Sequence, residues 1–290
     1  MIFFIALKKQ KHRTLWPVER SYTKTTSERS MNFQNTTYII VGGTSGMGLS
    51  AALALQNQGA HLVVIGREDA HLATAKKQLG DQSIVIAGDA TAPETIDQAI
   101  SLGHKKNGPI TGLYHVAGGS GRKFGDGPLH EMSLEGWNKT LELNLTSVML
   151  SNRAIINYFM GQKLPGIILN MGSVLGFSPS PKYFVTHAYA AAKSAIIGFS
   201  KSIAAYYASH DIRINVIAPG LMATPMAQRA VNDETIQAFI KTKQPLDGGR
   251  PGRPEDLNEA VLMLLSPASK FITGQVLAVD GGWGISEGQY

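Results

Sequence analysis

The chain has 290 residues, a length that suits one large α/β domain or two small ones. It contains no cysteine, which excludes disulfides, thiolate nucleophiles and cysteine-ligated metals. The formal net charge is +6, but residues 1–33 carry seven basic and two acidic side chains, so the rest of the chain is nearly neutral and gives no reason to expect a nucleic-acid partner.

Residues 1–33 form a basic N-terminal extension that opens with an apolar run from Met1 to Leu7. The run is shorter than the roughly 20 residues of a membrane-spanning helix. Its basic residues follow the run, whereas those of a secretory signal precede it. We therefore expect a disordered leader, or a true start at Met31, and a cytoplasmic protein without a membrane partner. A tail of this kind could touch nucleic acid or anionic lipid, but a solvated tail is the simpler interpretation.

From residue 34 to residue 290, short apolar runs alternate with helical patterns. The runs are flanked by Gly, Pro, Asp or Asn, as expected of strands that are buried on both faces. This alternation predicts one α/β domain, a Rossmann-type doubly wound parallel sheet of about seven strands with helices on both faces. The expected strands are 38–41, 62–65, 83–87, 112–116, 166–170, 213–217 and 275–279, and the expected helices include 47–58, 94–103, 134–160, 188–209 and 254–265.

A glycine-rich turn joins the first expected strand to the first expected helix. Glycines allow a tight turn and bring backbone N–H groups close to a pyrophosphate at the helix N-terminus. The strand, turn and helix occur in the required order, so the pattern predicts a dinucleotide site, to which the two hydroxyl side chains of the turn could add donors. The expected contacts are Gly42, Thr44, Ser45, Gly46, Met47 and Gly48.

The end of the second expected strand bears on the choice of cofactor. An acid at this point would bond the ribose 2′-hydroxyl of NAD, but the chain has Gly66 followed by Arg67. A guanidinium suits a 2′-phosphate, so we expect NADP(H) rather than NAD(H). Glu68 and Asp69 follow directly, and the alternative is that Arg67 is an ordinary solvated side chain.

Three further residues have side chains suited to acid–base chemistry on a substrate. Tyr189 and Lys193 are four residues apart on an expected helix and so share one face. A phenol, with a pKa of about 10, is a poor base at neutral pH unless a nearby cation favours the phenolate. Ser173 follows the fifth expected strand, where its hydroxyl could polarise a carbonyl or simply cap a helix. The histidines have no metal-binding spacing, so no metal is expected.

Together these motifs resemble those of the short-chain dehydrogenase/reductase family, over roughly residues 36–284. The chain departs from the family pattern at Val41, where Thr is usual, and at His115-Val116, where Asn-Asn is usual. We interpret His115 as a structural strand-end residue rather than a catalytic one. The resemblance rests on the glycine turn, the Ser173 and Tyr189-x-x-x-Lys193 arrangement, the segment 137–145 that contains Asn144, and the segments 214–220, 272–275 and 279–282.

The resemblance implies an oxidoreductase that transfers a hydride between NADP(H) and a carbonyl or secondary-alcohol substrate, with ketone or 3-oxoacyl-like reduction expected. Tyr189 would be the acid in reduction and the base in oxidation. Lys193 would lower the pKa of Tyr189 and bond the nicotinamide ribose. Ser173 would position the carbonyl, and Asn144 would hold a water that links Lys193 to solvent.

The resemblance also implies cofactor contacts at the ends of the later strands, and a homo-oligomer, either a tetramer or a dimer. Segments 119–131, 177–188 and 221–246 would shape the substrate pocket, but none carries a substrate signature. Two other functions remain open: a dinucleotide-binding scaffold or sensor without turnover, and an isomerase or dehydratase that uses NADP transiently. The implied contacts are Asp89, Ala90, Ala117, Gly118, Pro219, Gly220 and Thr224, besides Tyr189 and Lys193.

Overall fold

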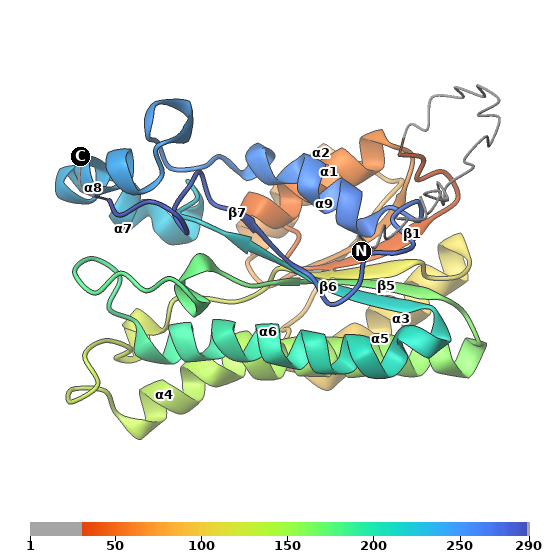
Figure 1. Ribbon diagram of the computed structural model, residues 1–290. Helices are drawn as coiled ribbons and strands as arrows, with labels where there is room; N and C mark the ends of the chain where they lie inside the picture. Colours follow the sequence, from red (N-terminus) through yellow and green to blue (C-terminus); the bar gives the residue numbers. More distant parts are fainter. Residues whose placement is uncertain (1–30, 289–290) are drawn as a thin grey trace, which may run out of the picture. The chain divides into compact units, whose positions relative to one another are not determined.

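The computed structural model describes residues 31–288, which form a seven-stranded, wholly parallel sheet in the order β3-β2-β1-β4-β5-β6-β7 (Figure 1). The predicted single-domain, doubly wound fold is confirmed, and every predicted strand lies within two residues of an observed one. The strands are β1 (Thr37–Val41), β2 (His61–Gly66), β3 (Ile84–Ala87), β4 (Gly112–His115), β5 (Gly166–Met171), β6 (Ile212–Pro219) and β7 (Val276–Val279).

Helices cover both faces of the sheet. Helices α1, α2 and α9 pack on one face, and α3, α5 and α6 pack on the other, as Figure 1 shows for α1 and α9 against α5 and α6. The helices are α1 (Gly46–Asn57), α2 (Asp69–Leu79), α3 (Pro93–Asn107), α4 (Leu134–Leu141), α5 (Ser147–Gln162), α6 (His187–Tyr207), α7 (Gln228–Val231), α8 (Glu234–Lys243) and α9 (Asn258–Leu265).

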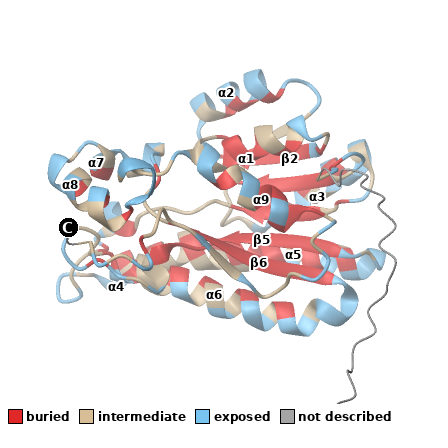
Figure 2. Ribbon diagram, turned by 45° about the horizontal axis from the view of Figure 1, so that its top comes forward, coloured by how far each residue is buried: buried red, intermediate tan, exposed pale blue. Residues whose placement is uncertain are grey.

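The core follows from the alternation of side chains along each buried strand. In β1, Tyr38 and Ile40 join the apolar cluster under α1 and α9, whereas Ile39 and Val41 join the cluster under α3 and α5. Figure 2 shows the central strands buried along their length, with exposed residues on the outer faces of the helices. Burial on both faces is why these strands are continuous apolar runs in the sequence.

The prediction of one helix over residues 134–160 is wrong in one respect. The structure has α4, then a π-helical segment from Glu142 to Thr146, and then α5. The extra residue of a π turn shifts the helix face, and such turns are common at functional sites. Asn144 lies in the middle of this segment and is fully buried.

The packed domain begins before the predicted boundary at residue 34. Phe33 is fully buried and meets Tyr38 edge-on, with ring centroids 5.8 Å apart. The predicted leader, residues 1–30, lies outside the described residues, so that interpretation stays a prediction. In the described part of the chain, no helix has the length and apolar character needed to cross a membrane.

A buried polar cluster ties β5 to the two long helices beneath it. The amides of Asn152 on α5 and Asn170 on β5 bond each other reciprocally, with both N···O distances 2.9 Å. Asn170 also donates to the Ser200 hydroxyl of α6, 3.0 Å away. All three side chains are buried, so each polar group depends on the others for its partner.

We expect Asn170→Ala to lower the free energy of unfolding by about 2 kcal/mol or more, because it leaves buried donors and acceptors unpaired. Urea unfolding measures this loss. Asn232→Ala, at an exposed position, is the control and should change stability by less than about 0.5 kcal/mol. The Asn152→Ala/Asn170→Ala double variant should lose less than the two single losses added together. Strict additivity would show that the pair is not coupled.

Candidate active site

The turn between β1 and α1 needs glycine because neighbouring backbone atoms lie too close to leave room for a side chain. Gly42 has φ +81°, and a Cβ atom there would lie 2.6 Å from the backbone nitrogen of Ala117. A Cβ atom at Gly48 would lie 2.1 Å from the carbonyl oxygen of Gly42. The turn therefore sits directly against the end of β4.

Helix α1 presents unpaired backbone N–H groups at this turn. Its N-cap residue, Ser45, makes no side-chain capping bond, and the first turn of the helix has no acidic residue. The donors and the positive end of the helix dipole are therefore available to an anion. This is the arrangement that a cofactor pyrophosphate requires, so the residues present fit a dinucleotide.

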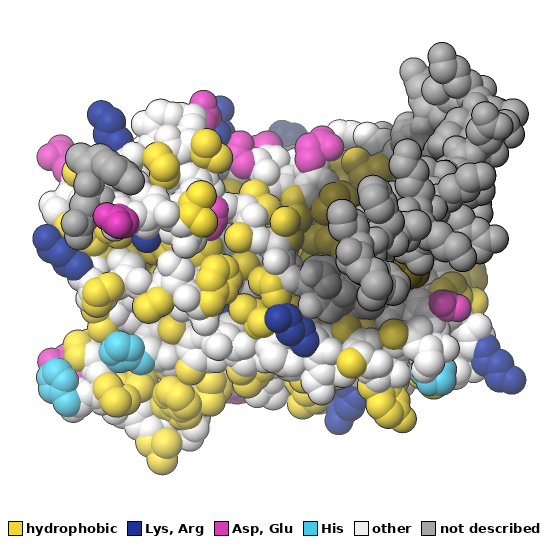
Figure 3. All heavy atoms as spheres, in the orientation of Figure 1, with side chains coloured by type: hydrophobic (Ala, Val, Ile, Leu, Met, Phe, Trp, Pro, Cys, Tyr) yellow, Lys and Arg dark blue, Asp and Glu magenta, His cyan; other side chains and the backbone are white. Residues whose placement is uncertain are grey.

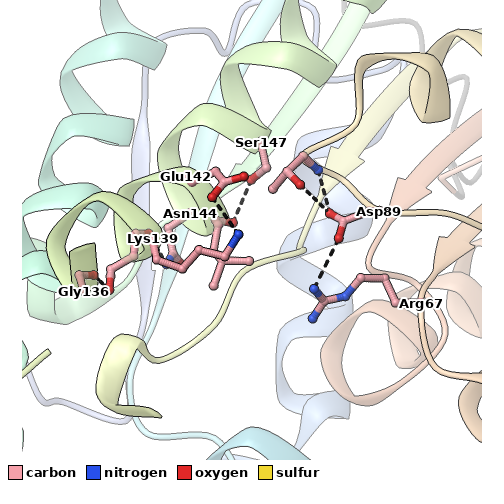
Figure 4. Close-up of polar contacts among 10 residues, drawn as sticks. Arg67, Asp89, Gly136, Lys139, Glu142, Asn144 and Ser147 are labelled. Atoms are coloured by element: carbon pink, nitrogen blue, oxygen red, sulfur yellow. Dashed lines mark hydrogen bonds and ion pairs between the residues drawn. The ribbon is translucent and has the colours of Figure 1, made fainter. Parts of the chain in front are cut away.

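The end of β2 has a cation and no room for an acid. Figure 4 shows Arg67 facing Asp89, with Nη1 3.5 Å from a carboxylate oxygen and both side chains about half exposed. Asp89 also accepts two bonds of 2.8 Å from Thr91. A Cβ atom at Gly66 would lie 2.0 Å from the Thr44 hydroxyl oxygen. Thr44 thus occupies the place where an acidic side chain at position 66 would begin.

Asp89 is not freely available to neutralise Arg67. Partial burial by itself would raise the pKa of the Asp89 carboxyl, but the hydrogen bonds from Thr91 and the charge of Arg67 together hold it below its ordinary value. The carboxylate is committed first to Thr91, at short distances, and only loosely to Arg67. The guanidinium keeps most of its donors for another anion.

The four predicted catalytic residues line one cavity of about 180 Å³ at the carboxyl edge of the sheet. Ser173 follows β5, Tyr189 and Lys193 come from α6, and Asn144 comes from the π-helical segment. Met47, Gly118, Pro219, Gly220 and Thr224 line the same cavity. The other predicted contacts do not line it but lie toward the β1–β3 side: Gly42, Thr44, Ser45, Gly46, Gly48, Arg67, Asp89, Ala90 and Ala117.

Lys193 is buried and anchored to the sheet. Its Nζ donates to the carbonyl oxygen of Met171, at the end of β5, over 2.9 Å, and lies 5.5 Å from the centroid of the Tyr189 ring. Burial lowers the pKa of Lys193 to about 8. The Lys193 ammonium is therefore mostly charged at neutral pH and loses its proton as the pH rises through about 8.

The protonation of Tyr189 differs from the expectation that Lys193 lowers its pKa. Burial raises the pKa of the Tyr189 phenol above its ordinary value, and a hydrogen bond with Ser173 only partly opposes that rise. The phenol therefore carries its proton at neutral pH, which is the form that donates in a reduction. Ser173 also accepts a bond of 3.2 Å from the backbone N–H of Leu175, so its hydroxyl caps a short helical turn while it faces the cavity.

Asn144 joins the helix to the loop after β4. Its Nδ2 donates to the carbonyl oxygens of Thr140 and Gly119, both 2.9 Å away, and its Oδ1 accepts from the Gly119 N–H over 3.1 Å. A Cβ atom at Gly118 would lie 2.7 Å from that oxygen and 3.6 Å from Lys193 Nζ. The amide is therefore a clamp beside Lys193, and its water-holding role remains a prediction.

His115 is a structural residue. It is fully buried at the end of β4, with Nδ1 2.7 Å from the Ser151 hydroxyl and Nε2 3.2 Å from the carbonyl oxygen of Ala117. Burial and the charge of Lys193 lower the pKa of His115 to about 3, so the ring is neutral. It does not line the cavity. Its hydrogen bonds hold the end of β4 where the family pattern has Asn.

Two positioning residues were missed by sequence reasoning. The buried carboxylate of Asp126 accepts from the backbone N–H groups of Ala188 and Tyr189, both at 2.9 Å, and so fixes the start of α6. Buried Gln244 accepts from the N–H of Leu221 over 2.5 Å and holds the segment after β6. Both act over distances in sequence that no local pattern reveals.

The comparisons agree with this geometry. Residues 41–284 match the family model described as enoyl-(acyl carrier protein) reductase. The chain is 33% identical to 2-(S)-hydroxypropyl-CoM dehydrogenase 3 of Xanthobacter autotrophicus, over 87% of this chain and 98% of that protein. It is 32% identical to a 3-oxoacyl-(acyl-carrier-protein) reductase of Vibrio cholerae, with the same two coverages.

A solved structure shows the same fold. The short-chain type dehydrogenase/reductase of Mycobacterium marinum superposes with a TM-score of 0.80 at 27% identity, over 88% of this chain and 98% of that one. With a family model that matches most of the chain, relatives that are matched along nearly their whole length, and a site at the carboxyl edge of the sheet, the chain belongs to the short-chain dehydrogenase/reductase family of oxidoreductases.

Proposed function

We propose that this protein transfers a hydride between NADP(H) and a carbonyl or secondary-alcohol substrate, with reduction of a ketone or 3-oxoacyl-like group as its main direction. The observation that carries the proposal is the shared cavity. A protonated Tyr189, the charged Lys193 and the Ser173 hydroxyl meet there, next to the N-terminus of α1.

The chemistry divides between cofactor and protein. The nicotinamide supplies the hydride when bound. Ser173 and Tyr189 hydrogen-bond the carbonyl oxygen and hold the carbon in place. As charge develops on that oxygen, Tyr189 donates its phenolic proton. Lys193, which the Met171 carbonyl holds beneath the ring, stabilises the phenolate that is left.

The preference for NADP(H) is supported by the end of β2. Arg67 has donors free for a 2′-phosphate, and Thr44 excludes from position 66 the acid that would select NAD(H). A large reduced NADPH pool in the cytoplasm, where we place the protein, would favour reduction.

The substrate class and the assembly are proposed on different grounds. By their names, one of the relatives above acts on a 2-hydroxypropyl group, which is a secondary alcohol, and the other acts on a 3-oxoacyl group, which is a ketone. We also propose a homo-oligomer, either a tetramer or a dimer. Figure 3 shows hydrophobic side chains spread over one face of the molecule, and the side chains of Phe271 and Tyr206 are largely exposed.

Tyr189→Phe keeps the ring and removes the proton that is transferred. We expect the rate of NADPH-dependent ketone reduction to fall by about 100-fold or more, with the Kd for NADPH within about twofold of wild type. Steady-state absorbance and fluorescence titration measure the two quantities. A variant that keeps a tenth of the rate would remove Tyr189 from the proposed role.

The same assay separates the other two functions. Turnover of the substrate without a net change in NADPH absorbance would favour an isomerase or dehydratase. Cofactor binding without turnover on a broad panel of ketones and alcohols would favour a scaffold or sensor.

Arg67→Ala should weaken NADPH binding by about tenfold or more, because charge-assisted hydrogen bonds to the 2′-phosphate are lost. Binding of NADH, which lacks that phosphate, should be unchanged. The control is Arg153→Ala, which removes an exposed arginine far along the chain, on α5. It should alter neither affinity. A wild-type protein that binds NADH as tightly as NADPH would overturn the proposed preference.

The pH dependence should follow Lys193. Its pKa of about 8 means that the ammonium is present below that pH and lost above it, while Tyr189 stays protonated through the same range. We expect kcat/KM for reduction to be level at neutral pH and to fall above about pH 8. A kcat/KM that rises steadily from pH 8 to about pH 10 would contradict this assignment.

A further inference from the structure

Two arginines from distant parts of the chain meet at the cavity. Arg122 lies in the helical turn Gly121–Phe124 after β4, and Arg229 lies in α7. The Nη2 atoms of both arginines donate to the same acceptor, the carbonyl oxygen of Tyr183, each over 3.3 Å. Both residues are exposed, and both line the cavity that contains Tyr189 and Ser173.

Neither guanidinium is neutralised by a carboxylate. No ion pair joins Arg122 or Arg229 to an acid within residues 31–288. Asp126 is close enough to favour the charge on Arg122, but its two oxygens bond the backbone at the start of α6. Asp233 lines an adjacent hollow with both arginines and caps α8 through the N–H groups of Thr235 and Ile236.

The two charges act on each other. Partial burial, and then the charge of Arg229, lower the pKa of Arg122 below its ordinary value. Two like charges held against one neutral oxygen are unfavourable unless an anion joins them. Each guanidinium has five N–H donors and uses one of them in a side-chain hydrogen bond within the described chain. The site therefore has both the charge and the free donors to bind an oxyanion.

We propose that Arg122 and Arg229 form an anion subsite that binds a carboxylate, sulfonate or phosphate group of the substrate, away from the carbon that reacts. This inference rests on the proposed ketone reduction. The two guanidinium groups bind the oxyanion, and the cavity that they line also has apolar side chains, among them Leu175, Phe184 and Trp283. The substrate is therefore an anionic ketone with an apolar middle.

A cofactor phosphate is the competing source of the same chemistry. Other groups already serve the expected phosphates of the cofactor: the N-terminus of α1 and, at the end of β2, Arg67. The arginine pair sits on different segments, the loop after β4 and the segment after β6. We therefore assign it to the substrate, and the experiment measures cofactor affinity separately.

The test uses two probes of nearly the same shape, one anionic and one neutral. The full-length protein, saturated with NADP⁺ so that no reduction occurs, is titrated calorimetrically with 4-acetylbenzoate and with the neutral 4-acetylbenzamide. We expect the acid to bind about tenfold tighter or more, and the difference to shrink at high salt. The Arg122→Gln/Arg229→Gln double variant should bind both probes equally, with the NADPH Kd unchanged.

Lys241→Gln is the matched control, because it removes one exposed positive charge from α8 without touching the cavity. It should keep the preference for the acid. If the double variant does not fold, Arg122→Gln and Arg229→Gln are measured singly, and each should lose at least about threefold of the preference. Thermal melting establishes that the variants are folded.

Two results with the wild type would overturn the subsite: no binding of the acid, or equal binding of the acid and the amide. Two results with the double variant would also overturn it: an unchanged preference for the acid, or a weakened affinity for NADPH. The last would assign the arginines to the cofactor. Reduction of neutral ketones by NADPH is measured in parallel. If the protein reduces ketones but does not prefer the acid, the subsite is refuted and the proposed function stands. If it prefers the acid but reduces no ketone, the proposed function is refuted and the subsite stands.

Discussion

The close contact between the glycine turn and the end of β4 is the constraint on which the rest of the site depends. The sheet order reverses at β1, so the connections from β1 and β4 leave on opposite faces and open a crevice between them. A Cβ atom at Gly42 would collide with the backbone of Ala117 and close that crevice. With glycine there, the unpaired N–H groups of α1 point into it, and the remaining groups are arranged along one edge of the sheet.

The proposed catalytic side chains are held by buried hydrogen bonds to other elements of the fold. Lys193 is tied to the end of β5, and Tyr189 lies in the first turn of α6, where Asp126 accepts hydrogen bonds from the N–H groups of Ala188 and Tyr189. Asn144 bonds the loop after β4 through both ends of its amide. These bonds fasten Lys193, Tyr189 and Asn144 to β5 and to the loop after β4, so the core of the fold sets the positions of the three residues.

The sequence predicts the parts of this structure that depend on local pattern. The strands are visible because burial on both faces makes them apolar runs. Helix α2 is not among the helices named from the sequence, and it has a weak pattern because only Leu72, Ala75 and Leu79 on it are buried, which leaves a thin apolar stripe. The π-helical segment at Asn144 was missed because its composition continues that of α4 and α5. The raised pKa of Tyr189 depends on burial and not on spacing, so the pair Tyr189 and Lys193 alone misled that prediction.

What the sequence conceals most completely is the substrate end of the cavity, and the reason is physical. The cofactor end is made by a contiguous turn, whose glycines a reader can recognise. The proposed substrate end is assembled from three segments that meet at the Tyr183 carbonyl oxygen. These segments lie outside the sheet, those of Tyr183 and Arg229 pack in a small apolar cluster of their own, and loops of this kind vary more than the elements that they connect. An oxyanion held at their junction would set the distance from the substrate's charged end to Tyr189, so these three segments would select the substrate while the sheet positions the proposed catalytic residues.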